Sequence, residues 1–163
     1  MSLSIPENNL SILSGIEKFK YLQNIDVSGN SLTSLKELGS IKHLIKLNAS
    51  NNLLKFTFDF ANPANLEWVD YSGNKISRIS GAEGNLYLKY LYLDNNQITH
   101  IDGLHNNKNL RVLSLNGNGI ERIENLEGLW IEELFISANN LTQIEGLETL
   151  PVLRTLDLSK NQI

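Results

Sequence analysis

Residues 98–120 read ITHIDGLHNNKNLRVLSLNGNGI, and the apolar pattern of this stretch recurs along the whole chain of 163 residues. Aligned on the leucine that opens LRVLSL, the pattern begins again every 22 residues, with one interval of 21. Each unit approximates L-x-x-L-x-L-x-x-N-x-L-x-x-I-x-G-L-x-x-L. A repeat of this length is typical of a solenoid, in which each unit packs only on its neighbours. The full units begin at Leu22, Leu44, Leu66, Leu88, Leu110 and Ile131, between partial units over 1–21 and 153–163.

The ninth position of every unit is asparagine, and Asn8 takes the same place in the partial first unit. At this position the chain turns inside the stack, where backbone N–H and C=O groups cannot reach water. An asparagine side chain can both donate and accept hydrogen bonds, so we expect a ladder that satisfies these groups. The ladder is therefore predicted to be structural, and its members are Asn30, Asn52, Asn74, Asn96, Asn118, Asn139 and Asn161.

The phrase L-x-L, as in Leu113-Ser114-Leu115, predicts a short strand with one buried face. Successive units should stack these strands into a parallel sheet at about 4.8 Å spacing. A unit this short leaves room only for a tight turn opposite the sheet, which the glycine of I-x-G-L permits. We therefore predict an α/β repeat solenoid of the leucine-rich-repeat type. It is expected to be a right-handed superhelix with a parallel concave sheet and short 3-10 or irregular convex turns.

Several units depart from the pattern. In the sixth position Ala49 precedes Tyr71 by one unit, and we expect this small and large pair to interdigitate. Trp130 stands at the one-residue deletion, where we expect it to fill the gap beside the next strand. The chain starts and stops inside a unit, so both ends are expected to be truncated. Loose convex packing is predicted where three units lack their last apolar residue, at Pro63, Asn85 and Asn107.

The third and fifth positions of each unit are predicted to face the concave side. Neighbouring units carry large aromatic side chains there, among carboxylates, which is the composition of a protein-binding surface. We expect a protein partner to bind this face. The alternatives are that another part of the parent protein covers it, or that it has no role. The predicted partner-binding residues are Trp68, Tyr90, Tyr92, Val112, Phe135, Asp70, Asp94 and Glu133.

Composition argues against several other functions. A net charge of −4 is unfavourable for nucleic acid, which needs a basic face to neutralise phosphates. No apolar run approaches the roughly 20 residues of a membrane span. With no cysteine and 3 histidines, the chain is expected to hold neither a metal ion nor a cofactor. It also lacks phosphate-loop and nucleophile-elbow motifs, so we expect neither catalysis nor a small-molecule substrate.

The phrases ITHIDGLHNNKNLRVLSLNGNGI and LTQIEGLETLPVLRTLDLSKNQI (residues 141–163) resemble the SDS22-like class of leucine-rich repeats, and the resemblance covers essentially the whole chain. Residues 44–77 and 125–147 also resemble the repeat region of proteins that join leucine-rich repeats to a guanylate-kinase domain. The shared features are the N-A-S-x-N phrase, a phenylalanine-rich second unit with a proline, and the 21-residue unit. The kinase-like domain is absent from this sequence, so the resemblance implies no such activity.

The SDS22-like resemblance implies a cytoplasmic interaction scaffold, often associated with the cytoskeleton or with cilia. The lack of cysteine agrees with a reducing, intracellular setting. Because the class includes a regulatory subunit of a protein phosphatase, the first alternative is a regulatory subunit that grips an enzyme. The second alternative is a structural spacer in a larger multidomain protein.

Overall fold

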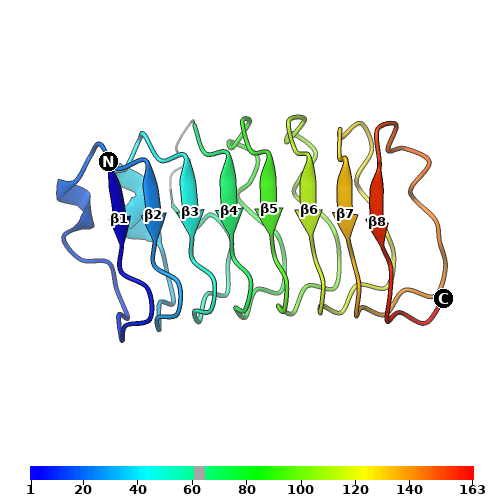
Figure 1. The fold of residues 1–163 in the computed structure, drawn as a ribbon, viewed down its shortest axis with the longest axis horizontal. Helices are drawn as coiled ribbons and strands as arrows, with labels where there is room; N and C mark the ends of the chain where they lie inside the picture. Colours follow the sequence, from blue (N-terminus) through cyan, green and yellow to red (C-terminus); the bar gives the residue numbers. More distant parts are fainter. Residues whose placement is uncertain (61–64) are drawn as a thin grey trace.

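The structure is a computed structural model and describes residues 1–60 and 65–163. Within these residues, eight strands of three residues each form one parallel sheet in chain order (Figure 1). The predicted solenoid with a parallel sheet is confirmed. The strands are β1 (Ser2–Ser4), β2 (Asn24–Asp26), β3 (Lys46–Asn48), β4 (Trp68–Asp70), β5 (Tyr90–Tyr92), β6 (Val112–Ser114), β7 (Glu133–Phe135) and β8 (Thr155–Asp157).

The register of the sheet follows the repeat. Equivalent positions of successive units lie side by side, so that Trp68 pairs with Tyr90 and Asp70 pairs with Tyr92. The unit of 21 residues keeps this register, because Val112 still pairs with Glu133. The missing residue is therefore absorbed in the return segment, and the rows of side chains on the sheet remain unbroken.

The convex side consists of short 3-10 segments and turns, as predicted. The two 3-10 segments of the described chain are η1 (Ile16–Lys18) and η2 (Lys36–Ser40). Gly15 precedes η1 with a φ of 91°, a left-handed conformation that favours glycine. In the described part of the chain, no helix has the length and apolar character needed to cross a membrane.

The middle residues of β2 to β7 are leucine, isoleucine or valine, and they are buried in the core; those of β1 and β8, at the two ends of the sheet, are partly exposed. Ala49 and Tyr71 are both fully buried in the adjacent sixth positions. The Tyr71 ring packs edge-on against Phe58 at 5.4 Å between centroids, and its hydroxyl oxygen accepts a 3.2 Å hydrogen bond from the Phe58 N–H. Burial raises the pKa of the Tyr71 phenol far above its usual value. The phenol therefore serves as a neutral core group.

The repeating asparagines hold the turns that follow the strands. In each unit from Asn30 to Asn161, Oδ1 accepts the N–H of the residue 19 or 20 positions earlier at 2.9–3.0 Å. Asn96, for example, accepts from the Ile76 N–H and donates to the carbonyls of Tyr71 and Leu93. Each side chain thus forms hydrogen bonds with its own turn and with the preceding one. This need for both a donor and an acceptor explains why asparagine recurs at the position.

Two expectations for the return segments are wrong. Trp130 does not fill the gap at the deletion but is 51% exposed, because Leu129 and Ile131 on either side of it are fully buried and already occupy the core. Asn85 and Asn107 are also fully buried, so the convex side is closed there. The Asn107 amide donates to the carbonyls of Ala82 and Asn85 at 3.1 and 2.9 Å, and replaces apolar packing by hydrogen bonds. Pro63, the third residue of this group, lies outside the described residues.

Candidate functional site

Two parallel rows of side chains cross the middle of the concave face. The first row runs Trp68, Tyr90, Val112 and Glu133 on β4 to β7, and the second runs Asp70, Tyr92, Ser114 and Phe135 on the same strands. Directly paired residues lie on the same face of a sheet and their side chains are neighbours. The predicted partner-binding residues other than Asp94 therefore lie in these two rows. Asp94 follows Tyr92 by two residues.

Trp68 and Tyr92 form the aromatic centre of this surface. Their ring centroids are 5.6 Å apart, with an interplanar angle of 48°. The ammonium group of Lys46, on the neighbouring strand β3, lies 4.1 Å from the centroid of the Trp68 ring. At this distance the negative π face of the indole attracts the cation. The two aromatic residues remain half-buried rather than core residues, so part of each ring faces solvent.

The other apolar residues of the two rows contribute unequally. Tyr90 is 38% exposed and Phe135 is half-buried, but Val112 is only 8% exposed. Val112 is a short side chain between its two strand partners, Tyr90 and Glu133, which explains its burial. The expectation that Val112 offers contact surface is therefore wrong. In the second row Ser114 lies between Tyr92 and Phe135. Phe135 is therefore an apolar residue separate from the Trp68–Tyr92 pair.

The carboxylates beside the aromatic centre are held in place by backbone and hydroxyl donors. The Ser72 N–H donates to Asp70 at 2.8 Å. Asp94 accepts hydrogen bonds from the Ser114 hydroxyl at 2.6 Å and from the Asn116 N–H at 2.8 Å. Bonds from a residue two positions later are typical of the turns that Asp and Asn form. These neutral donors orient each carboxylate and leave its negative charge uncompensated.

The negative field of these carboxylates acts on Tyr92. Burial is the largest cause that raises the pKa of the Tyr92 phenol, and the charges of Glu133 and Asp70 raise it further. Asp70 pairs directly with Tyr92 in the sheet, so its carboxylate and the phenol ring are neighbours in one row. Aromatic surface and negative charge therefore form a single site rather than two.

The N-terminal edge of the same strands has a different electrostatic character. There the charged residues neutralise one another across neighbouring units, with Lys89 and Glu67 2.8 Å apart. Glu132 pairs with Arg111 at 3.6 Å and with Arg154 at 3.3 Å. Among residues 1–60 and 65–163, by contrast, no ion pair involves Asp70, Asp94 or Glu133.

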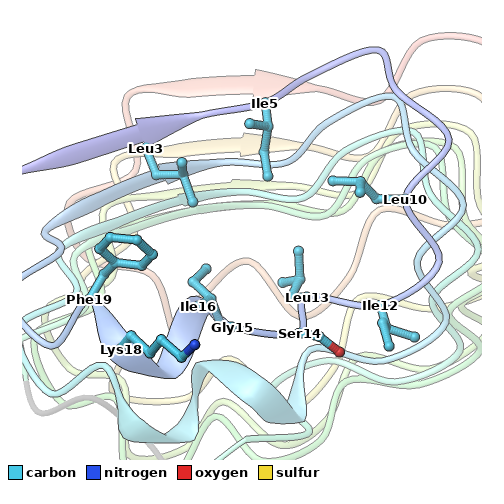
Figure 2. Close-up of a pocket in the computed structure, with 10 residues that line it drawn as sticks. All are labelled: Leu3, Ile5, Leu10, Ile12, Leu13, Ser14, Gly15, Ile16, Lys18 and Phe19. Carbon is cyan, nitrogen blue, oxygen red and sulfur yellow. The ribbon is translucent and has the colours of Figure 1, made fainter.

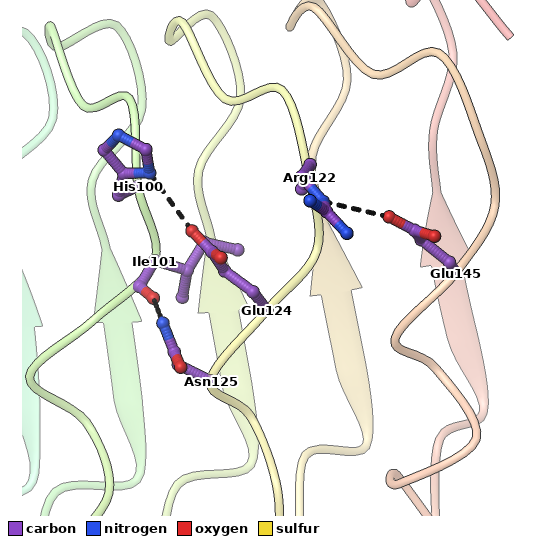
Figure 3. A network of polar contacts seen from close by, with 6 residues as sticks. All are labelled: His100, Ile101, Arg122, Glu124, Asn125 and Glu145. Carbon is purple, nitrogen blue, oxygen red and sulfur yellow. Dashed lines mark hydrogen bonds and ion pairs between the residues drawn. The ribbon is translucent and has the colours of Figure 1, made fainter.

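Away from the concave face, polar contacts again join neighbouring units (Figure 3). His100 lies 3.1 Å from Glu124, Arg122 lies 3.1 Å from Glu145, and the Asn125 amide donates to the Ile101 carbonyl at 2.8 Å. These contacts are distributed along the array and do not converge on one point. Within the described ranges, no group of three or more histidine, cysteine, aspartate or glutamate residues could hold a metal ion.

A second surface feature is an apolar hollow of about 420 Å³ at the N-terminal end of the array, between β1 and η1 (Figure 2). Leu3, Ile5 and Leu10 point into it from one side, and Leu13 and Phe19 from the other. These residues belong to the first partial unit, where the stacked core reaches the end of the described chain. The hollow is thus the continuation of the core and has a single charged lining residue, Lys18.

One contact on the concave face was not predicted from the sequence, namely the cation–π contact between the Lys46 ammonium and the Trp68 ring. The register places Lys46 directly beside Trp68, so the pairing was available as a signal. The orientation of the carboxylates also has a sequence signal. An aspartate in the fifth position followed by a serine in the seventh, as in Asp70 and Ser72, is the pattern of an Asx turn.

Residues 88–128 match the family described as "Leucine Rich repeats (2 copies)". The match covers β5 and β6 with their asparagine turns, which are the elements that define the repeat. The chain has the fold of a leucine-rich-repeat solenoid. No curated protein gives a significant sequence match to it. The finer resemblance to the SDS22-like class stays a prediction.

Solved structures extend the likeness of this leucine-rich-repeat solenoid to nearly its whole length. Internalin C2 from Listeria monocytogenes is 29% identical, with a TM-score of 0.92 over 99% of this chain and 72% of that one. A chain of the LRIM1/APL1C complex is 32% identical, with a TM-score of 0.86 over 98% of this chain and 30% of that one. The TLR13–ssRNA13 complex gives 26% identity and a TM-score of 0.78, over 96% of this chain and 23% of that one. The solenoid therefore spans less than a third of the last two chains.

Proposed function

We propose that this leucine-rich-repeat solenoid is a non-catalytic module that binds a protein partner on its concave face. The observation that carries the proposal is the half-exposed pair of Trp68 and Tyr92 on a hydrogen-bonded sheet, surrounded by carboxylates that have no ion-pair partner among the described residues. Exposed aromatic side chains on a rigid scaffold contribute much binding energy at a small cost in conformational entropy.

The similar structures support a partner of this kind. One of them is part of the LRIM1/APL1C complex, in which the named components are proteins. Another is the TLR13–ssRNA13 complex, so repeats of this kind also occur in a complex with RNA. On the present chain the carboxylates around Trp68 repel phosphate, which favours protein over nucleic acid. The SDS22-like resemblance further supports a scaffold in the cytoplasm, at the cytoskeleton or in cilia.

The test is a pull-down from cell lysate with three forms of the chain. The wild type is compared with Trp68→Ala/Tyr92→Ala/Phe135→Ala and with a matched control, Leu86→Ala/Tyr87→Ala/Trp130→Ala. The control removes three exposed apolar side chains that lie outside the strands. Circular dichroism first establishes that all three are folded.

A protein retained by the wild type and the control, but lost by the concave variant, is the expected result. Identification of that protein by mass spectrometry then distinguishes a scaffold from a regulatory subunit that grips an enzyme such as a protein phosphatase. Equal retention by all three forms would contradict a concave binding site. Retention of RNA instead of protein would contradict the proposed partner class.

A further inference from the structure

We propose that the partner segment bound by the concave face is basic and extended, with one lysine or arginine side chain seated between the Trp68–Tyr92 pair and the carboxylate of Asp70. The inference rests on the proposed function and adds the chemistry of the partner to it. Three features of the concave face support it: a cation already bound to an aromatic ring, carboxylates without a counterion, and the length over which the charges are distributed.

The first feature is the position of Lys46. Its ammonium group lies over the Trp68 ring at 4.1 Å, so the indole face is accessible to a cation and has the orientation to attract one. Lys46 is exposed and, within the described residues, forms no ion pair that would fix it there. An incoming lysine or arginine therefore competes with a weakly held side chain of the same chemistry.

The second feature is the contrast between the two edges of the sheet. At the N-terminal edge, Glu67 and Glu132 are neutralised by Lys89, Arg111 and Arg154 of neighbouring units. Asp70 and Asp94 receive hydrogen bonds from serine and asparagine donors, and no ion pair with either is found in residues 1–60 and 65–163. Hydrogen bonds within the chain thus orient these carboxylates, and their negative charge is available to a basic partner. Asp70 pairs directly with Tyr92 in the sheet, so its charge lies beside the aromatic centre.

The third feature is the spread of three aspartates, Asp26, Asp70 and Asp157, along the fifth positions of the sheet, where the other strands carry neutral residues. Asp26 on β2 and Asp157 on β8 accept the N–H of Ser28 and Ser159 in the same way that Asp70 accepts that of Ser72. Strands β2 and β8 are six intervals apart in the sheet, which corresponds to roughly 29 Å at about 4.8 Å per strand. An extended segment covers that distance with about nine residues. A peptide of twelve residues therefore suffices to follow the whole row.

The experiment selects ligands without assuming their charge. A displayed library of random dodecapeptides is panned on the immobilised wild-type chain, and in parallel on Trp68→Ala/Tyr92→Ala/Phe135→Ala. Peptides that bind the wild type and not the concave variant are sequenced and synthesised with a fluorophore. Dissociation constants are then measured by fluorescence anisotropy, at low and at physiological ionic strength.

Two matched pairs of variants test the charge. Asp70→Asn/Asp94→Asn/Glu133→Gln removes three charges from the concave face, and Asp102→Asn/Glu121→Gln/Glu127→Gln removes three from exposed positions elsewhere, so both reach the same net charge. The amides retain the hydrogen-bond acceptors of the carboxylates. Lys46→Gln removes the resident cation, and Lys20→Gln removes a charge of the same sign outside the strands.

The expected peptides are enriched in lysine and arginine. Their dissociation constant should rise about tenfold in the concave charge variant, because the carboxylates that attract the basic side chains are neutralised. It should fall about two- to fivefold in Lys46→Gln, by the usual strength of an exposed cation–π contact. The two control variants should bind as the wild type does.

Three outcomes are distinguishable. Acidic or neutral peptides that depend on the three aromatic residues would overturn the basic partner while the proposed binding face stands. Equal binding of basic peptides by the two triple charge variants would also overturn it, since net charge alone would then explain the selection. Peptides that bind the wild type and the aromatic variant equally well would contradict both the inference and the proposed function.

Discussion

The asparagine turns and the concave face lie next to each other along every repeat, yet the residue is constant in the turns and varies on the face. In the turns the same residue makes the same bonds in each unit, as Asn74 and Asn96 do with the preceding turn. On the concave face the equivalent positions change from unit to unit, from Lys46 to Trp68 to Tyr90. The ladder asparagines are buried or half-buried and are satisfied within the chain, whereas the face retains partly exposed rings and carboxylates that form no ion pair among the described residues.

Within a single repeat, the residues that stabilise the fold therefore differ from those that are available for binding. Replacing an asparagine whose side chain bonds only backbone groups lowers stability, because the replacement leaves buried donors and acceptors without partners. A position that points away from the core carries no such constraint, and its residue is available for recognition. The strands therefore supply one row of core residues and two rows on the concave face, where partner contacts are proposed.

The largest contrast is expected between two aromatic residues of the same unit. Tyr71→Ala removes a fully buried ring and should lower the free energy of unfolding by about 3–5 kcal/mol. Trp68→Ala removes a half-buried ring from the concave face and should cost less than about 1 kcal/mol. Urea unfolding followed by circular dichroism measures both. A loss of similar size in the two variants would show that Trp68 supports the core and that the comparison fails.

A smaller effect is expected in the asparagine ladder. Asn96→Leu leaves the N–H of Ile76 and the carbonyls of Tyr71 and Leu93 without their partner. The expected loss is on the order of 1–3 kcal/mol. Asn106→Leu makes the same change at an exposed position and is the control. Thermal melts should separate the two variants, and an unchanged melting temperature for Asn96→Leu would mean that water replaces the amide.

The smallest effect concerns the charge of the concave face. Because the Asp70 carboxylate raises the pKa of Tyr92, Asp70→Asn should lower that pKa toward the ordinary value for tyrosine. The phenol can be followed in an alkaline titration by NMR of the labelled ring, with Tyr92→Phe to assign the resonance. Asp102→Asn, at an exposed position outside the strands, serves as the control. If both variants titrate like the wild type, Asp70 does not act on the aromatic centre.

The architecture could be predicted from the sequence because it depends on a short pattern that repeats. The interval of 22 residues sets the register, and the alternation in Leu113-Ser114-Leu115 assigns each residue to the core or to the concave face. These are local rules, since a strand residue faces one side or the other irrespective of what lies far away. For the same reason the repeat pattern alone places Trp68, Tyr90 and Tyr92 in neighbouring rows of the concave face.

The packing of neighbouring units determines how much of each side chain remains accessible and which group it contacts. Trp130 is exposed because its two neighbours fill the shortened return, and Asn107 is buried because carbonyls of the preceding unit accept its amide. Val112 is covered by its neighbours, whereas Trp68 holds the ammonium group of Lys46. Each of these outcomes depends on the volume and the polar groups of adjacent units. A repeat pattern specifies the direction of a side chain, but only packing in three dimensions determines its partners.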